Sequence, residues 1–234
     1  MIMDKPIYIC ENHEMAFYYW CKGKKEMKID VFFLVTVDRH TDLMEWGRQS
    51  DIRKEVNRLD LNDLIKIKEL ASRSRIQKNN LAYRQPRAAM EAGLVGDMLL
   101  ISHEAPYEEI YEDLSKRKHR IFHCVHPNGL KDLLMKNKIL RRSIGYDKNA
   151  DANLILDIDL DFFTYLDQHD IPHVISEEDF KEIFSSDSLL WWIYKKARLV
   201  TISKESFWCG GIDNSEHIFK LLKTYFLNKQ TTNA

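Results

Sequence analysis

The segment that most constrains the fold is Val31–Val37, whose sequence VFFLVTV is apolar except for Thr36. A strand with one exposed face alternates apolar and polar side chains, whereas a strand covered on both faces reads as a continuous apolar run. Parallel strands covered on both faces are joined by crossover connections, which are usually helices. The run therefore predicts a central, mostly parallel sheet between two helical layers, which is a three-layer α/β sandwich.

Apolar, β-branched runs recur along the chain and alternate with segments of helical spacing. The predicted strands are Ile7–Cys10, Val31–Val37, Met98–Ser102, Ile121–Val125, Leu154–Asp157 and Leu199–Ser203. The predicted helices are Glu14–Lys22, Ile52–Ser72, Pro86–Ala92, Tyr107–Lys118, Leu130–Lys138, Glu177–Lys196 and Asn214–Leu227. The sequence has no repeat and no Gly- or Pro-rich linker, so we expect one domain over residues 1–234.

Charge and cysteine content narrow the class of protein. The 35 basic and 36 acidic side chains give a net charge of −1, which provides no general attraction for nucleic acid or an anionic membrane. The four cysteines contain no Cys-x-x-Cys pair, the N-terminus lacks a signal-peptide pattern, and no apolar run is long enough to span a bilayer. We expect a cytoplasmic protein with reduced cysteines. Its oligomeric state is left open.

A charged cluster, VDRHTDL, follows the central strand directly. Side chains two residues apart in an extended chain point the same way, so Asp38, His40 and Asp42 are expected to share one face. In parallel α/β sheets, ligands bind beyond the carboxyl ends of the strands, where this cluster lies. A helix cap or a turn is the structural alternative for such a triplet.

A second cluster, LDIDLDFF, closes the apolar run at Leu154, and its Asp157, Asp159 and Asp161 are again expected to share a face. Carboxylates this close repel one another and take up protons unless a cation neutralises them. Two such clusters at the ends of two buried strands indicate a metal site. Carboxylate oxygens with one or two imidazoles suit manganese, with zinc or iron as alternatives.

The motifs resemble those of the arginase and agmatinase superfamily. VDRHTDL is similar to its Asp-x-His-x-Asp motif, with Arg39 where alanine is usual, and LDIDLDFF is similar to its second aspartate motif. His13, in ENHEMAFYYW, matches a further metal-binding histidine upstream. ENHEMAFYYW and LDIDLDFF also resemble a little-characterised arginase-like family that includes peptide arginases. The resemblance runs from His13 to about Leu227, through motifs and their order.

The resemblance implies a fold of the arginase/deacetylase type and a centre with two Mn²⁺ ions. Asp38 and Asp159 would bridge the ions, with Asp161 as a rival of Asp159 on the same face. The implied metal ligands are His13, Asp38, His40, Asp42, Asp157 and Asp159.

Three residues are candidates for catalysis. Glu205, after the strand Leu199–Ser203, would face the guanidinium group of the substrate, and Asp42 would pass a proton to the leaving amine. His103 is a candidate for a proton shuttle, with an ordinary loop histidine as the alternative.

The implied reaction is hydrolysis of a guanidinium group to urea. Arginases for the free amino acid follow the first motif with Asn, Ser and His, whereas this chain reads LMEWGRQSDIRKEV after Asp42. This departure favours a larger substrate, and the resemblance implies arginine residues in a ribosomally made precursor peptide, which would be converted to ornithine. A small free guanidine compound is the first alternative. A zinc deacetylase is disfavoured because no His-His pair occurs, and a binding module without catalysis would leave six ligands unexplained.

Overall fold

The computed structural model describes residues 5–44, 51–74, 81, 84–116, 118–147 and 152–227. At its centre is a six-stranded sheet with the order β1-β8-β5-β2-β3-β4, in which every neighbouring pair is parallel. The strands are β1 (Ile7–Cys10), β2 (Phe32–Val37), β3 (Val95–Ile101), β4 (Ile121–Cys124), β5 (Leu154–Asp159) and β8 (Leu199–Ser203). The predicted α/β class and parallel sheet are confirmed.

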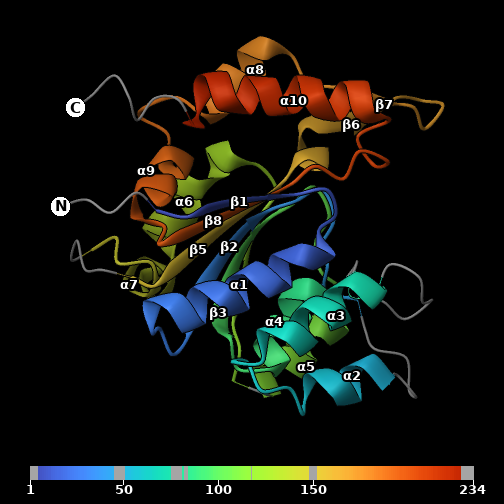
Figure 1. The fold of residues 1–234 in the computed structure, drawn as a ribbon. Coiled ribbons are helices and arrows are strands. Elements are labelled where there is room, and N and C mark those ends of the chain that lie inside the picture. The colour runs from blue at the N-terminus through green and yellow to red at the C-terminus, as the bar shows by residue number, and fades with distance from the viewer. Residues whose placement is uncertain are drawn as a thin grey trace.

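Helices cover both faces of this sheet and give three layers (Figure 1). One layer contains α1 (Glu14–Met27), α2 (Asp51–Val56), α3 (Leu64–Ser74), α4 (Gln85–Glu91) and α5 (Glu108–Lys116). The other contains α6 (Leu130–Lys136), α7 (Lys138–Ser143), α8 (Glu177–Ile183), α9 (Leu189–Lys196) and α10 (Ile212–Tyr225). Two apolar cores lie between the layers, because alternate residues of the central strands point to opposite faces. Every residue of β2 is buried, as its sequence predicts.

Two long helices predicted from the sequence are each divided in two. The segment Ile52–Ser72 forms α2 and α3, and Glu177–Lys196 forms α8 and α9. The second helix of each pair begins after a capping side chain, since Asp63 accepts from the Lys66 N–H and Ser188 from the Trp191 N–H. Short polar side chains bond the backbone in this way and favour a new helix start over continuation. Both single-helix predictions were therefore wrong.

A small antiparallel hairpin, β6 (Thr164–Leu166) with β7 (Pro172–Val174), was not predicted. It follows β5 through a 3₁₀ turn at Leu160–Phe163. The turn ends the straight course of β5 immediately after Asp159, so the hairpin lies outside the main sheet. Within the described ranges, no helix has the length and apolar character needed to cross a membrane.

The sheet order places four chain segments at one edge. β1, β8, β5 and β2 are consecutive neighbours, and in a parallel sheet their carboxyl ends lie together. The residues that follow these strands are His13, Glu205, Asp161 and Asp38. Segments far apart in sequence therefore meet at a single site.

Candidate metal centre

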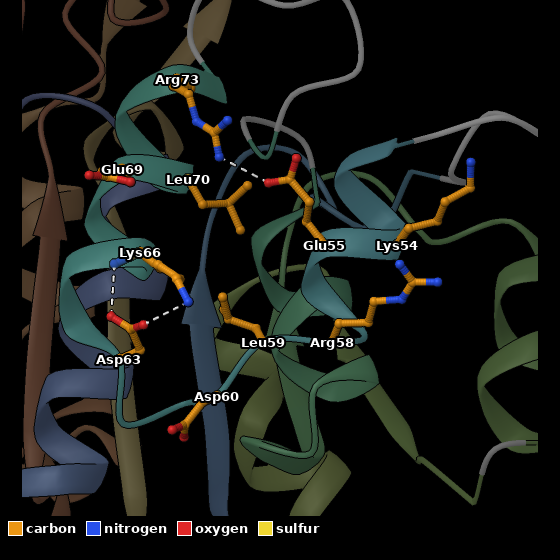
Figure 2. Close-up of a pocket in the computed structure, with 10 residues that line it drawn as sticks. All are labelled: Lys54, Glu55, Arg58, Leu59, Asp60, Asp63, Lys66, Glu69, Leu70 and Arg73. Atoms are coloured by element: carbon orange, nitrogen blue, oxygen red, sulfur yellow. Dashed lines mark hydrogen bonds and ion pairs between the residues drawn. The ribbon is translucent and has the colours of Figure 1, made fainter.

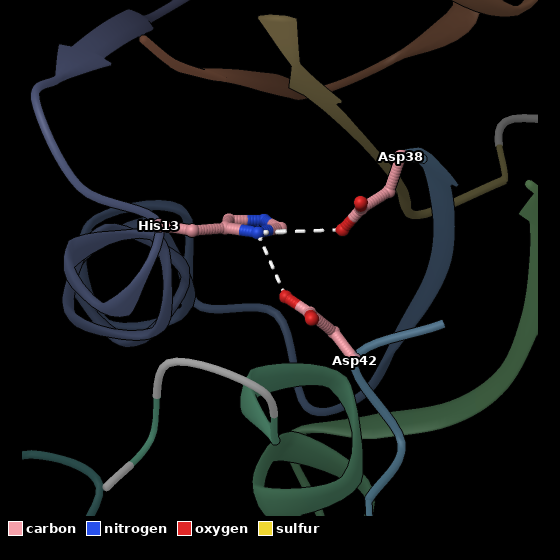
Figure 3. A group of neighbouring side chains, drawn as sticks. All are labelled: His13, Asp38 and Asp42. Atoms are coloured by element: carbon pink, nitrogen blue, oxygen red, sulfur yellow. Dashed lines mark ion pairs between the residues drawn. The ribbon is translucent and has the colours of Figure 1, made fainter. Parts of the chain in front are cut away.

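His13 is the centre of the site. It lies between β1 and α1, only 1% of its surface is exposed, and its Nε2 is 2.6 Å from Oδ2 of Asp157. Its Nδ1 lies 3.0 Å from Asp42 Oδ2, 3.1 Å from Asp159 Oδ2 and 3.4 Å from Asp38 Oδ2. Figure 3 shows the side chains of His13, Asp38 and Asp42 pointing toward one another. None of these oxygens lies in hydrogen-bonding geometry, so Nδ1 is a buried nitrogen without a hydrogen-bond partner in the described structure.

The first motif forms a tight loop after β2. The Asp38 Oδ1 accepts the N–H of His40 at 2.8 Å, and the Ser102 hydroxyl donates to the carbonyls of Arg39 and His40 at 3.0 and 3.1 Å. Asp42 has a φ of 47°, in the left-handed region that aspartate tolerates better than most residues. This backbone course turns Asp38 and Asp42, both buried, toward His13.

The second motif contributes Asp159 from the end of β5 and Asp161 from the following turn. The N–H of Asp161 donates to Asp159 Oδ1 at 3.2 Å, and the N–H of Arg39 donates to Asp161 Oδ1 at 3.3 Å. Ligand atoms of Asp38, Asp159 and Asp161 lie within 4.8 Å of one another, as do those of His13, Asp38 and Asp42. The two groups share Asp38, so the two motifs meet around one carboxylate.

His40 lies at the edge of this cluster, with 29% of its side chain exposed. Its Nδ1 is 3.2 Å from Glu104 Oε1, and its Nε2 is 3.7 Å from Asp161 Oδ2. Its ring also packs edge-on against Trp208, with centroids 5.7 Å apart. His40 therefore reaches Asp161 from the solvent side, between Glu104 and Trp208, neither of which the sequence had identified.

Asp157 lies behind the cluster and is fully buried. Its Oδ1 accepts from the Thr201 hydroxyl, and its Oδ2 accepts from the Thr36 hydroxyl at 3.1 Å besides facing His13. Trp20 Nε1 donates to Thr201 at 3.0 Å. Thr36 and Thr201 are polar residues within buried parallel strands. This pattern is the sequence signal that could have identified them as partners of a buried polar group.

Glu205 and His103, both predicted in catalysis, have different surroundings. Glu205 follows β8 with a φ of 40°, and its Oε1 accepts the N–H of His13 at 2.5 Å. His103 is exposed, its Nε2 lies 3.1 Å from the carbonyl oxygen of Phe162, and its ring stacks on the Phe162 ring at 4.6 Å. The structure thus brings Glu205 to His13, whereas His103 contacts Phe162 and no carboxylate of the cluster.

The electrostatics of the site follow from burial. Burial, together with the neighbouring carboxylates, raises the pKa values of Asp38 and Asp159 well above the usual range, and burial raises that of Asp161. Burial alone would lower the pKa of His13, but Asp157 and the other carboxylates raise it well above its usual value. Burial also raises the pKa of Glu205 to about 7. The side chains therefore gather more negative charge than this buried place can hold without protons or cations.

The residues present fit a divalent metal centre. Nδ1 of His13 is a buried donor atom facing three carboxylate oxygens, which is the arrangement of an imidazole ligand beside acidic ligands. A cation would satisfy Nδ1 and neutralise the carboxylates whose pKa values are raised. Carboxylates with imidazole form the kind of donor set that binds manganese, iron or a catalytic zinc ion. A structural zinc site, by contrast, normally contains cysteine.

Two hollows on the surface differ in their relation to this cluster. One, of about 650 Å³, lies between α2 and α3 (Figure 2), and two ion pairs lie in its lining, Arg73 with Glu55 at 2.9 Å and Lys66 with Asp63 at 3.2 Å. Another, of about 340 Å³, is lined by Thr41, Met44, Tyr107, Glu109 and Ile110. Thr41 stands between His40 and Asp42 in the sequence, so this second pocket shares a loop with the cluster, although no side chain of the cluster lines it.

Fold and site together define the class: a parallel α/β protein with a buried carboxylate and histidine cluster at the carboxyl edge of its sheet. No family model matches the chain, and no curated protein matches it.

Solved structures with a similar course of the chain include a proclavaminate amidino hydrolase and two arginases. Proclavaminate amidino hydrolase from Streptomyces clavuligerus is 9% identical with a TM-score of 0.48, over 94% of this chain and 63% of that one. Helicobacter pylori arginase is 14% identical with a TM-score of 0.48, over 95% and 74%. Bacillus cereus arginase is 14% identical with a TM-score of 0.46, over 93% and 68%. This chain thus spans less than two thirds of the first of them, and its function has to be argued from its own residues.

Proposed function

We propose that this protein is a binuclear metal hydrolase that cleaves a guanidinium group and releases urea. The observation that supports this most directly is His13 Nδ1. This buried nitrogen has no hydrogen-bond partner among the described residues and faces oxygens of Asp38, Asp42 and Asp159. A protein core rarely leaves such an atom unsatisfied, and a metal ion would provide the missing partner.

The ligands divide into two overlapping groups. His13, Asp38, Asp42 and Asp159 surround one position, and Asp38, Asp159 and Asp161 surround a second, which His40 approaches from the solvent side. This division adds Asp161 to the ligands expected from the sequence. When bound, two ions of manganese or a similar metal supply a nucleophile at neutral pH, because they lower the pKa of water.

Glu205 is the residue that would hold the substrate. A guanidinium group stays protonated below about pH 12 and needs a carboxylate partner. The N–H of His13 fixes one oxygen of Glu205, which directs this carboxylate to the ligand cluster. Burial raises the pKa of Glu205 to about 7, and a bound cation would lower it and keep the carboxylate ionised.

Asp42 would move the proton. Hydrolysis adds one water across the bond between the guanidinium carbon and the substituted nitrogen, so the carbon leaves as urea and the nitrogen leaves as an amine. That amine needs a proton before it departs. Asp42 is buried beside His13 and within the cluster, where a carboxylate can receive the proton of the attacking water and deliver it.

An arginine side chain within a peptide is the substrate we propose, with ornithine as the product. The segment after Asp42 (LMEWGRQSDIRKEV, of which residues 45–50 lie outside the described structure) lacks the Asn, Ser and His expected for a free amino acid. The pocket beside Thr41 is lined by apolar Met44 and Tyr107 together with acidic Glu109, which suits the neighbours of a basic residue in a peptide. Phe207, 81% exposed, offers a further apolar contact next to Trp208.

The experiment is a comparison of urea release by the manganese-loaded protein. Free arginine, agmatine and a panel of arginine-containing peptides are compared, each with and without a chelator. Chelator-sensitive urea from peptides alone supports the whole proposal. Urea from a small compound keeps the reaction and changes the substrate. Bound metal without urea from any compound refutes the reaction and directs attention to amide hydrolysis.

Two variants test the assigned roles. Asp42→Asn should abolish turnover, whereas Glu205→Gln should mainly raise KM because it weakens capture of the cation. Glu112→Gln, an equivalent change at an exposed residue of α5, is the control and should leave both constants unchanged. Near-normal urea release by Asp42→Asn would refute its role in proton transfer.

A further inference from the structure

Asp157 was expected from the sequence to be a metal ligand, but its surroundings differ from those of the other aspartates. We propose that Asp157 is a positioning residue: it holds the imidazole of His13 by Nε2 so that Nδ1 is presented to the metal. This inference rests on the metal centre of the proposed function. It assigns Asp157 to holding a metal ligand in place, and not to binding the metal itself.

The geometry separates Asp157 from the ligand atoms. Both of its oxygens are already engaged, Oδ1 by the Thr201 hydroxyl and Oδ2 by the Thr36 hydroxyl and His13 Nε2. Neither group of ligand atoms that lie within 4.8 Å of one another includes Asp157. An ion bound to Asp157 would have to compete with these partners in a fully buried place.

The contact at Nε2 determines what Nδ1 can do. Neutral imidazole carries one N–H, and the carboxylate of Asp157 at 2.6 Å from Nε2 draws the proton to that nitrogen. Nδ1 then keeps its lone pair and faces Asp38, Asp42 and Asp159 as a metal donor. A carboxylate behind a histidine ligand also makes the ring more basic and fixes its orientation.

A chain of hydrogen bonds holds Asp157 itself. Trp20 Nε1 donates to Thr201, and Thr201 donates to Asp157. All three residues are fully buried, and they come from α1, β8 and β5. Because the helix that follows His13 and two central strands are tied together here, the ring cannot turn without breaking buried hydrogen bonds.

The test is calorimetric titration of Mn²⁺ into chelator-treated protein. Wild type should bind two ions. Asp157→Asn should still bind two, with affinity at one site reduced by about 10- to 100-fold, the usual effect of removing a partner behind a metal ligand. Asp187→Asn, the same chemical change at an exposed residue, is the control and should bind as wild type does. Asp161→Asn should lose one of the two sites.

A second readout follows the ring of His13 directly. In protein loaded with diamagnetic zinc, nitrogen and proton NMR should show a proton on Nε2 with a resonance far downfield, and this resonance should move upfield in Asp157→Asn. If Asp157→Asn does not fold, Thr201→Val removes one hydrogen bond to Asp157 with little change in shape. It should weaken one metal site several-fold.

The outcomes separate the two proposals. A wild-type protein that binds no metal contradicts the proposed function. Wild-type binding of two ions overturns the role of Asp157 in three cases: Asp157→Asn binds both equally well, it loses an ion entirely, or the proton of His13 resides on Nδ1. If only Thr201→Val can be studied, unchanged affinity overturns the role.

Discussion

Glu205 should make the metal-free protein less stable at neutral and alkaline pH. Burial raises its pKa from an ordinary 4.5 to about 7. Between these two values the folded protein binds the proton more tightly than the unfolded chain, so stability falls as pH rises through this window. The contribution is fully present below about pH 4.5 and is lost above about pH 7. The difference in pKa corresponds to about 3 kcal/mol, which partial access of water to the carboxylate reduces to about 1–2 kcal/mol.

The perturbation is Glu205→Gln, which keeps an oxygen to accept the His13 N–H but cannot ionise. In excess chelator, its free energy of unfolding should exceed that of wild type by about 1–2 kcal/mol at pH 8, and the difference should vanish near pH 4.5. Denaturant unfolding at four pH values measures this. Glu112→Gln, at an exposed ion pair with Lys116, should change stability by under about 0.5 kcal/mol at every pH. A Glu205→Gln variant that is less stable than wild type at pH 8, or a difference that does not depend on pH, would refute the reasoning.

Three further outcomes are expected. Mn²⁺ at 100 times its dissociation constant should stabilise the protein by about 2.7 kcal/mol per independent site and raise its Tm by several degrees, with no change in chelator. Gly210→Ala should lower the Tm by more than Gly93→Ala. Both glycines have positive φ, but a Cβ at Gly210 would lie 3.0 Å from Pro172, whereas one at Gly93 would meet no atom of the described residues within 4 Å. Trp208→Ala should raise KM for peptides by about tenfold while metal stoichiometry, measured by elemental analysis, stays at two; an unchanged KM would exclude Trp208 from substrate binding.

The sheet could be predicted because its strands have strong local signals. Val31–Val37 is apolar throughout except Thr36, as expected for the doubly covered centre of a parallel sheet, and its residues Phe32–Val37 form the buried strand β2. The helix boundaries were harder to predict from the sequence than the strands. The divisions before Leu64 and before Leu189 depend on single capping side chains, Asp63 and Ser188, which are ordinary residues on a helix surface unless the chain turns there.

The site could be predicted in part. The sequence identifies both motifs, and the structure brings His13, Asp38, Asp42 and Asp159 together. The sequence alone could not distinguish the roles of the three aspartates of the second motif. Strict alternation places them on one face, but β5 ends at Asp159 and a 3₁₀ turn carries Asp161 toward Asp38, while Asp157 stays within the strand behind His13. Thr201 was overlooked because a threonine in a strand is common and its partner lies 44 residues away.

The position of β8 has a consequence for biosynthesis. β8 is the last strand along the described chain, yet it lies between β1 and β5, and β1 has no other partner in the sheet. His13 meets Asp157 across 144 residues and Glu205 across 192. Domains acquire their native contacts as the ribosome releases them, and contacts this distant form late. A nascent or truncated chain that stops before Leu199 would carry His13 next to an unpaired β1, so we expect tight metal binding only in molecules whose synthesis has passed β8.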